Sequence, residues 1–168
     1  EPEYSMKKNS LRKYGELLKN NFDYILIDCQ PRMLNSDLLT SNEVALMASD
    51  YVIVPAVADK DSISGFQKVI NTMKRIQPEN PNLKLLGMVL TIVVGRNEKI
   101  FRHYKEKLKL QLGDLLFDTD IRRSTEMSQA LNSNVSIFDY NEKNATAEDY
   151  TNFSEEVLSK ISKFENNG

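Results

Sequence analysis

A short apolar run that ends in an aspartate constrains this sequence more than any other stretch. Tyr24-Ile25-Leu26-Ile27 has no polar break, is too short for a membrane-spanning helix and is rich in strand-favouring residues, so it predicts a strand buried on both faces. Asp28 ends the run, and the loop that follows it contains Pro31. Ligands of open parallel sheets lie beyond the carboxyl ends of the strands, so Asp28 is placed to face a ligand or a hydrated cation. The alternative is that Asp28 only caps the loop, because many parallel strands end in such a residue.

Length and composition favour one folded domain. The chain has 168 residues, 40% of them apolar, which is enough for a substantial core. Its 22 basic and 24 acidic side chains give a formal net charge of −2, so contact with nucleic acid requires a local basic patch. Cys29 is the only cysteine, which excludes an internal disulfide and fits a reducing compartment. No apolar run approaches the roughly 20 residues of a membrane span, and no signal-peptide pattern is present, so we expect a cytoplasmic protein without membrane contact.

Helical and strand patterns alternate along the chain. Apolar residues at helical spacing predict helices over residues 10–18, 61–76, 96–112, 124–132 and 146–164, the third with Ile100, Tyr104, Leu108 and Leu112 facing inward. Nearly continuous apolar runs predict further strands over residues 51–55, 85–94 and 115–117, the first ended by its proline. We expect a loop at 118–123 and extended chain at 135–138. This alternation predicts an α/β fold with a doubly wound, mainly parallel sheet and helices on both faces.

The region around Asp28 resembles a known family. Phe22–Pro31 is similar to the Walker B segment of the ParA/MinD family of deviant Walker P-loop ATPases, which typically reads Y-D-hydrophobic-I-I-D-x-P-P. Later stretches resemble further family motifs in the same order: Ala48–Pro55 (A-A-D-x-V-I-I-P), Leu85–Thr91 (I-x-G-V-L-L-T), Phe117–Arg123 (F-x-T-x-I-P-R) and Ala147–Val157 (A-x-x-Y-x-x-L-x-x-E-V). The resemblance runs from Phe22 to Leu158 and implies a P-loop NTPase-like fold of the SIMIBI type.

One hallmark of that family is missing from this sequence. The family begins with a phosphate-binding loop, K-G-G-x-G-K-T, whose backbone amides cradle phosphates, and neither this loop nor a D-x-D-P-Q segment occurs here. We therefore expect residues 1–168 to be a single α/β domain that forms the C-terminal part of a larger ParA-like ATPase domain, without its first strands. The alternative is a truncated homologue that no longer hydrolyses ATP. In either case the isolated chain should not hydrolyse ATP.

The resemblance implies a set of nucleotide-binding residues. Asp28 corresponds to the carboxylate that holds the water shell of Mg²⁺, and Pro31 to the loop that senses the γ-phosphate of ATP. Ile121, Arg122 and Arg123 correspond to the loop that lies against adenine. Arg122 replaces the proline of the family motif, which places that base contact in question.

A basic helix forms the second candidate site. Basic side chains and the single histidine cluster between residues 96 and 109: Arg96, Lys99, Arg102, His103, Lys105, Lys107 and Lys109. ParA-type proteins bind DNA without sequence preference through arginines in this region; Arg96 corresponds to one such position, with Lys99 and Arg102 beside it, whereas Glu126 replaces another. The alternative is an ordinary solvated helix face, because Glu98 and Glu106 intervene.

Two functional classes fit these features. The first is a ParA-like ATPase of plasmid or chromosome partition, in which ATP and Mg²⁺ sandwich a homodimer, the dimer binds DNA and a ParB-like partner triggers hydrolysis. The second is a non-catalytic interaction or regulatory module that keeps the sheet. A phosphoacceptor receiver domain fits poorly, because no acidic pair precedes Asp28 and no lysine ends a later strand. His103 has no second histidine or cysteine nearby, so it supports neither a metal site nor a catalytic triad.

Overall fold

The computed structural model describes residues 10–30, 40–59, 61–96 and 98–166. Its elements, in chain order, are α1 (Ser10–Leu18), α2 (Ser41–Ala48), β1 (Tyr51–Val57), α3 (Ser62–Ile76), β2 (Lys84–Val93), α4 (Lys99–Leu112), the 3₁₀ turn η1 (Gly113–Leu115), β3 (Leu116–Arg122), α5 (Thr125–Asn132), α6 (Ile137–Asn141) and α7 (Ala145–Asn166). The described residues fall into two compact units, one within residues 1–52 and 67–84, the other within residues 53–66 and 85–168. Each unit is described by itself.

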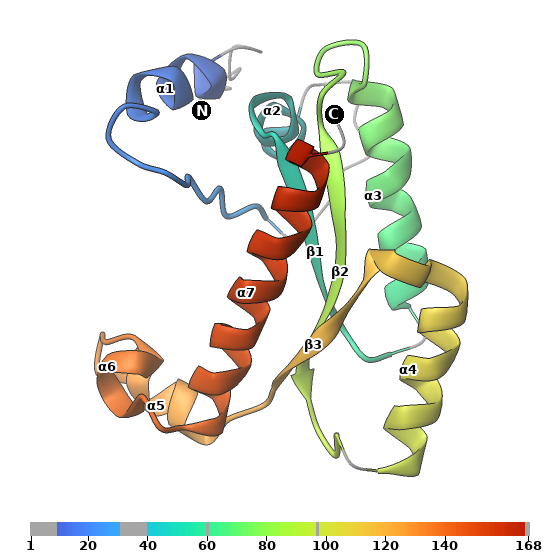
Figure 1. Cartoon of the computed structure of the whole chain (residues 1–168), viewed down its shortest axis with the longest axis vertical. Coiled ribbons are helices and arrows are strands. Elements are labelled where there is room, and N and C mark those ends of the chain that lie inside the picture. Colours follow the sequence, from blue (N-terminus) through green and yellow to red (C-terminus); the bar gives the residue numbers. More distant parts are fainter. Residues whose placement is uncertain (1–9, 31–39, 60, 97, 167–168) are drawn as a thin grey trace, which may run out of the picture. The chain divides into compact units, whose positions relative to one another are not determined.

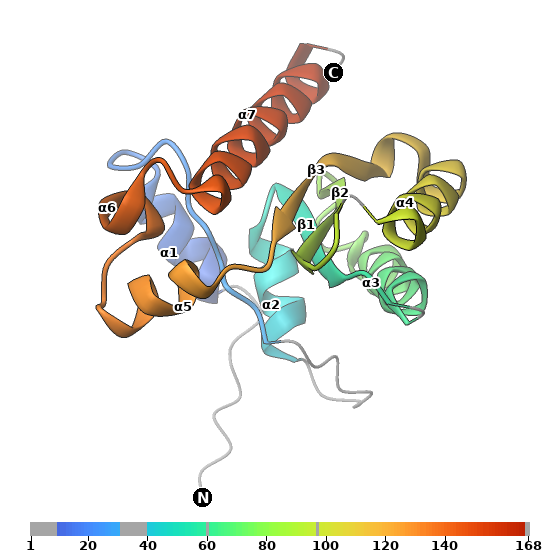
Figure 2. The ribbon, with the colours of Figure 1, turned by 90° about the horizontal axis from the view of Figure 1, so that it is seen from below.

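The sheet has the order β1-β2-β3 in the described residues. β2 and β3 run parallel, with Met88 opposite Leu116, Leu90 opposite Asp120 and Val93 opposite Arg122. In the second unit, α4 and α7 cover opposite faces of these two strands (Figures 1 and 2). The expected α/β fold with a parallel sheet and helices on both faces is confirmed.

The core of the second unit lies on both sides of β2 and β3. Met88 and Leu90 of β2, Phe117 of β3 and Leu108 of α4 are almost completely buried. The Phe117 ring meets Phe153 of α7 edge to face, with ring centroids 5.0 Å apart. Gly87 lets β2 approach η1 closely, because a Cβ atom at this position would collide with the backbone carbonyl of Leu115.

The first unit has a smaller core of its own. Leu46 and Met47 of α2 pack against Ile76 at the end of α3. A capping box in which the Thr40 and Glu43 side chains and backbones bond reciprocally starts α2. The Asn80 amide ends the same helix by donating to the carbonyl oxygens of Leu46 and Ser49, at 2.9 and 2.7 Å.

The prediction of a buried strand at Tyr24–Ile27 is wrong for this structure. Residues 23–30 follow α1 as non-regular chain, and all of them are exposed, Leu26 by 93%. The composition favours a strand, but a strand also needs neighbours for its N–H and C=O groups, and the described sheet consists only of β1, β2 and β3.

Several element boundaries also differ from the sequence prediction. β1 continues through Pro55 to Val57, which an edge strand tolerates because one row of its N–H groups needs no partner. Residues 118–122, expected as a loop, belong to β3. Residues 137–138, expected to be extended, begin α6, whose first turn is capped by the Ser136 hydroxyl. α4 begins at Lys99 rather than Arg96 and buries Phe101, leaving Ile100 81% exposed.

Candidate functional site

An open cleft of about 570 Å³ lies where β2 and β3 end. Three segments line it: residues 93–96 at the end of β2, residues 122–126 from the end of β3 into α5, and residues 144–146 at the start of α7. The carboxyl ends of parallel strands are the usual ligand-binding edge of an open α/β sheet. The volume lies within the range of small-molecule sites.

The end of β2 has an unusual backbone. The register with β3 shifts between Leu90 and Val93, as in a β-bulge, and Ile92 has a φ of 56°. A positive φ at a β-branched residue is a strained conformation. Gly95 follows with a φ of 65°, where glycine is favoured. Bulges of this kind re-aim the chain at the edge of a sheet, and here the re-aimed segment forms one wall of the cleft.

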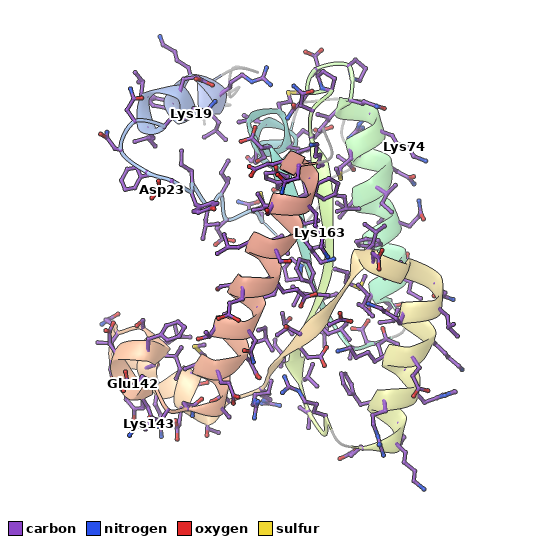
Figure 3. The ribbon with its side chains drawn as sticks, viewed as in Figure 1. Lys19, Asp23, Lys74, Glu142, Lys143 and Lys163 are labelled. Carbon is purple, nitrogen blue, oxygen red and sulfur yellow. The ribbon has the colours of Figure 1, made fainter. Side chains whose placement is uncertain are left out.

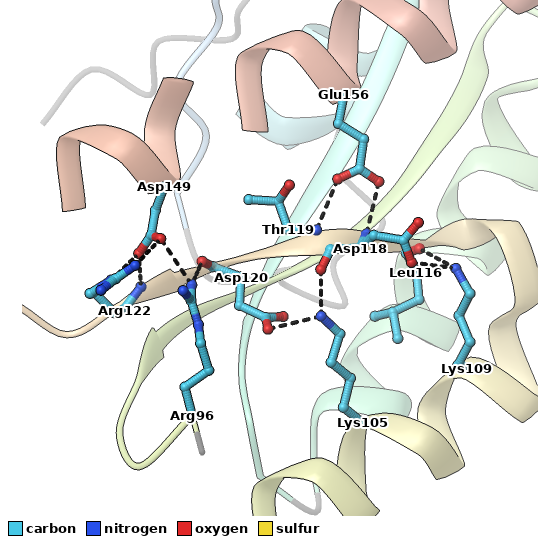
Figure 4. A network of polar contacts seen from close by, with 10 residues as sticks. All are labelled: Arg96, Lys105, Lys109, Leu116, Asp118, Thr119, Asp120, Arg122, Asp149 and Glu156. Atoms are coloured by element: carbon cyan, nitrogen blue, oxygen red, sulfur yellow. Dashed lines mark hydrogen bonds and ion pairs between the residues drawn. The ribbon is translucent and has the colours of Figure 1, made fainter. Parts of the chain in front are cut away.

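Asp149 of α7 holds Arg122 in the cleft wall. Its Oδ2 accepts hydrogen bonds from Arg122 Nε at 2.7 Å and from the Arg122 backbone N–H at 3.0 Å, and its Oδ1 accepts one from Arg122 Nη2 at 2.7 Å (Figure 4). The Asp149 residue is only 2% exposed. A bidentate pair of this kind fixes the plane of the guanidinium group as well as its position.

Arg96 also pairs with the carboxylate of Asp149. Its Nη2 lies 3.1 Å from Asp149 Oδ1 and also donates to the backbone oxygen of Asp120. Within the described chain its Nε is buried without a hydrogen-bond partner. Arg96 is predicted as a DNA contact, but in the structure its Nη2 is engaged with Asp149 of α7 and with the backbone of β3 (Figure 4).

The pKa values of the two buried carboxyl groups of this cluster shift in opposite directions, according to whether burial or the neighbouring cations have the larger effect. Burial raises the pKa of the Asp149 carboxyl, but the hydrogen bonds from Arg122 and the charge of Arg96 outweigh it, so the pKa lies below the ordinary 3.8. The hydrogen bond to Asp149 raises the pKa of the Arg122 guanidinium. Burial raises the pKa of Asp120 in spite of its hydrogen bond from Lys105. Asp149 is therefore a firmly ionised counter-ion for both arginines.

The basic helix divides into two faces. Lys105 pairs with Asp120 and Lys109 with Asp118, each at 2.8 Å, so these two lysines of α4 tie the helix to β3 (Figure 4). On the opposite side of the strand, the Glu156 carboxylate accepts the backbone N–H groups of Asp118 and Thr119 at 2.8 and 2.9 Å. Part of the basic cluster therefore holds the fold together.

The other two predicted DNA contacts are exposed to solvent. Lys99 and Arg102 are exposed on α4, as is His103. The structure thus separates the predicted set, with Lys99 and Arg102 on the surface and Arg96 in the ion-pair cluster.

The predicted nucleotide residues fall in different places. Arg122 and Arg123 line the cleft, whereas Ile121 is buried in β3 and is not part of its lining. Asp28 is exposed in residues 23–30, and Pro31 lies outside the described residues. Over those residues no group of three or more potential metal ligands is present, and no helix is both long and apolar enough to cross a membrane. The role of Asp28 toward Mg²⁺ stays a prediction.

Sequence reasoning missed Asp149. In the sequence Asp149 is only one position of the closing motif, and its partner Arg122 lies 27 residues earlier. A signal was present, because an arginine replaces the proline of the family motif and an aspartate stands in the first turns of the last helix. Only the fold brings Arg122 and Asp149 together.

Comparisons with known proteins agree with the resemblance seen in the sequence. The family described as "AAA domain" matches residues 3–85. The sporulation initiation inhibitor protein Soj of Bacillus subtilis (strain 168) is 32% identical over 148 residues, covering 88% of this chain and 56% of Soj. The chromosome partitioning protein ParA of Caulobacter vibrioides (strain NA1000 / CB15N) is 29% identical over 153 residues, covering 89% of this chain and 55% of ParA.

Solved structures share the fold. Apo McdA from Cyanthece matches with a TM-score of 0.68 at 18% identity, covering 93% of this chain and 60% of McdA. Cobyrinic acid a,c-diamide synthase from Mycobacterium smegmatis, solved with a bound ATP analog and magnesium, matches with a TM-score of 0.69 at 24% identity, covering 90% of this chain and 53% of the synthase. At these identities the likeness shows the fold alone.

The chain spans a little over half the length of the curated relatives Soj and ParA. Over that length, three observations coincide: the ordered motifs from Phe22 to Leu158, the parallel α/β sheet and the similarity to both relatives. Over that length this chain is similar in sequence to the ParA and Soj proteins, in agreement with its resemblance to the ParA/MinD family of P-loop ATPases.

Proposed function

We propose that the protein carrying this chain is a ParA-like ATPase of chromosome or plasmid partition that binds ATP with Mg²⁺ in the cytoplasm. The observation that carries the proposal is the cleft at the carboxyl ends of β2 and β3, whose lining includes Arg122 and Arg123. These are two of the residues that correspond to the adenine-facing loop of the family. The arginine side chains supply positive charge for a nucleotide, and the open edge of the sheet gives it access.

In this proposal residues 1–168 form the C-terminal part of the ATPase domain. Support comes from the apolar run after α1, in which Tyr24, Ile25, Leu26 and Ile27 are all exposed. Such side chains gain free energy when buried, by roughly 1.5–3 kcal/mol for each large residue. In the complete domain the run pairs as a strand, and Asp28 at its carboxyl end holds the water shell of Mg²⁺.

The proposal includes DNA and protein partners. ATP sandwiches a homodimer, the dimer binds DNA without sequence preference, and a ParB-like partner triggers hydrolysis. Lys99 and Arg102 support the DNA contact, because both are exposed on the same face of α4. Arg96 contributes only if it leaves the carboxylate of Asp149.

DNA binding by the intact protein, measured with and without ATP and Mg²⁺ across a salt series, tests the proposal. The variant Lys99→Glu with Arg102→Glu should weaken binding strongly, because it reverses two exposed charges without touching the ion-pair cluster. The matched control is Lys68→Glu with Lys74→Glu, which makes the same charge change on exposed positions of α3; the Lys74 side chain projects from that helix (Figure 3).

The expected result is ATP-dependent binding that weakens as salt rises and that the control variant retains. Absence of DNA binding under every condition, together with absence of ATP turnover, would favour a non-catalytic module. Equal loss of binding in both double variants would contradict a DNA interface on α4.

A further inference from the structure

Arg122 stands where the family motif has proline, and the structure suggests a physical reason for this replacement. In the motif, the proline ring offers a ligand a rigid apolar surface. Here the Arg122 guanidinium is held by two hydrogen bonds of 2.7 Å to the two oxygens of Asp149. A guanidinium fixed in this manner is also rigid, and in addition it is planar. The lining of the cleft includes this residue.

Arg122 and Asp149 behave as a matched pair. The Asp149 carboxylate also accepts the backbone N–H of Arg122 at 3.0 Å, a bond that proline cannot donate. Asp149 is 2% exposed, and a carboxylate so buried requires partners for its charge. The aspartate therefore serves both the side chain and the backbone of the residue that replaces proline.

The rest of the cleft has the character of a base-binding site. Val93 and Val94 give it an apolar wall, and Val94 is largely exposed. Thr146 lines the cleft, is 2% exposed, and its hydroxyl has no hydrogen-bond partner among the described residues. An apolar wall, a fixed planar cation and a buried unpaired hydroxyl suit a flat heterocycle with polar edges.

We propose that the Arg122–Asp149 pair is a stacking platform for the base of the bound nucleotide, with Asp149 as a positioning residue that fixes the guanidinium plane. This inference rests on the proposed nucleotide-binding function. A guanidinium stacks on the face of any base, whereas it contacts a phosphate only through its edge. Comparing the binding of a nucleotide with the binding of its phosphates alone therefore distinguishes the two possible contacts of Arg122.

The test compares two ligands of the intact protein, ATP and inorganic tripolyphosphate, each titrated in the presence of Mg²⁺. Arg122→Lys keeps the charge but removes the planar group. Asp149→Asn keeps the shape but leaves one acceptor oxygen instead of two, so the guanidinium plane is no longer fixed. Each should weaken ATP binding about tenfold, the scale of one base–side-chain stack, and leave tripolyphosphate binding unchanged. Arg102→Lys, the same change on the exposed face of α4, is the matched control and should alter neither affinity.

The outcomes separate the platform from other roles. Equal weakening of ATP and tripolyphosphate binding in Arg122→Lys would make Arg122 a phosphate contact and overturn the platform. Unchanged ATP binding in Arg122→Lys would overturn it as well. If the wild-type protein binds neither ligand, the nucleotide-binding function itself fails and the platform fails with it. Because Arg122→Lys keeps a cation beside Asp149, the test stands even if Asp149→Asn does not fold.

Discussion

Asp149→Asn should destabilise the protein by about 2–3 kcal/mol. Asp149 is 2% exposed and accepts three hydrogen bonds from Arg122 and one from Arg96. Breaking a buried ion pair by removing one partner costs about 3–5 kcal/mol. The cost here should be lower, because both arginine side chains are 34% exposed and can regain water, and because the asparagine oxygen still accepts a bond.

Urea unfolding followed by circular dichroism measures this cost. Asp118→Asn is the control, because Asp118 lies on the same part of the fold and pairs with Lys109 at 2.8 Å, but its side chain is 80% exposed. An exposed pair contributes about 0–1 kcal/mol, so the control should unfold nearly as the wild type does. A loss below 0.5 kcal/mol in Asp149→Asn, on the order of an ordinary surface change, would refute the importance assigned to the buried cluster.

Three further predictions concern pH and packing. Because the fold lowers the pKa of Asp149, the ionised carboxylate stabilises the folded protein above the ordinary pKa of about 4, and this contribution is lost as the pH falls through the pKa of the folded state. The difference in free energy of unfolding between the wild type and Asp149→Asn should therefore become smaller below about pH 4. Gly87→Ala should lower the free energy of unfolding in urea by about 2–4 kcal/mol, because φ is 143° and the added Cβ collides with backbone atoms. Gly65→Ala, which adds a Cβ in open space on α3, should instead raise it by up to about 1 kcal/mol. Equal changes in the two variants would contradict this reasoning. Phe117→Leu should cost about 1–2 kcal/mol by losing the edge-to-face contact with Phe153, and an unchanged unfolding midpoint would argue against that contact.

The sequence correctly predicted those helices and strands whose signals lie within their own residues. The helix expected over 61–76 is α3 (Ser62–Ile76), and the strand expected over 85–94 is β2 (Lys84–Val93). Both carry their own signals, a helical apolar stripe in the first and an unbroken apolar run in the second. The resemblance to the ParA/MinD family likewise rests on local motifs and their order along the chain.

Other elements were predicted wrongly, because they depend on contacts between residues that lie far apart in the sequence. Tyr24–Ile27 has the composition of a strand, but composition supplies no hydrogen-bonding neighbour. β3 extends to Arg122 although Asp118 and Asp120 interrupt its apolar pattern, because Lys109 and Lys105 of α4 neutralise these carboxylates. The Arg122–Asp149 cluster likewise depends on α7 lying across β3, which no single stretch of sequence specifies.

The division of the basic helix leads to a quantitative expectation for DNA binding. Six arginines and lysines lie between residues 96 and 109, and three of them are paired with aspartates: Arg96, Lys105 and Lys109. That leaves Lys99, Arg102 and Lys107 exposed. Each phosphate neutralised on duplex DNA contributes about −0.9 to the slope of log K against log salt.

Three free cations per copy therefore predict a slope of about −2.7, against about −5.4 if all six bound phosphate. A salt titration of the intact protein, analysed per copy, distinguishes these values. Removing Lys99 and Arg102 should reduce the magnitude of the slope by about 1.8, because two phosphate contacts are lost. A wild-type slope near −5.4 would mean that the ion pairs with Asp118, Asp120 and Asp149 open when DNA binds. In that case Asp149 would compete with DNA for Arg96, and Asp149→Asn should tighten DNA binding.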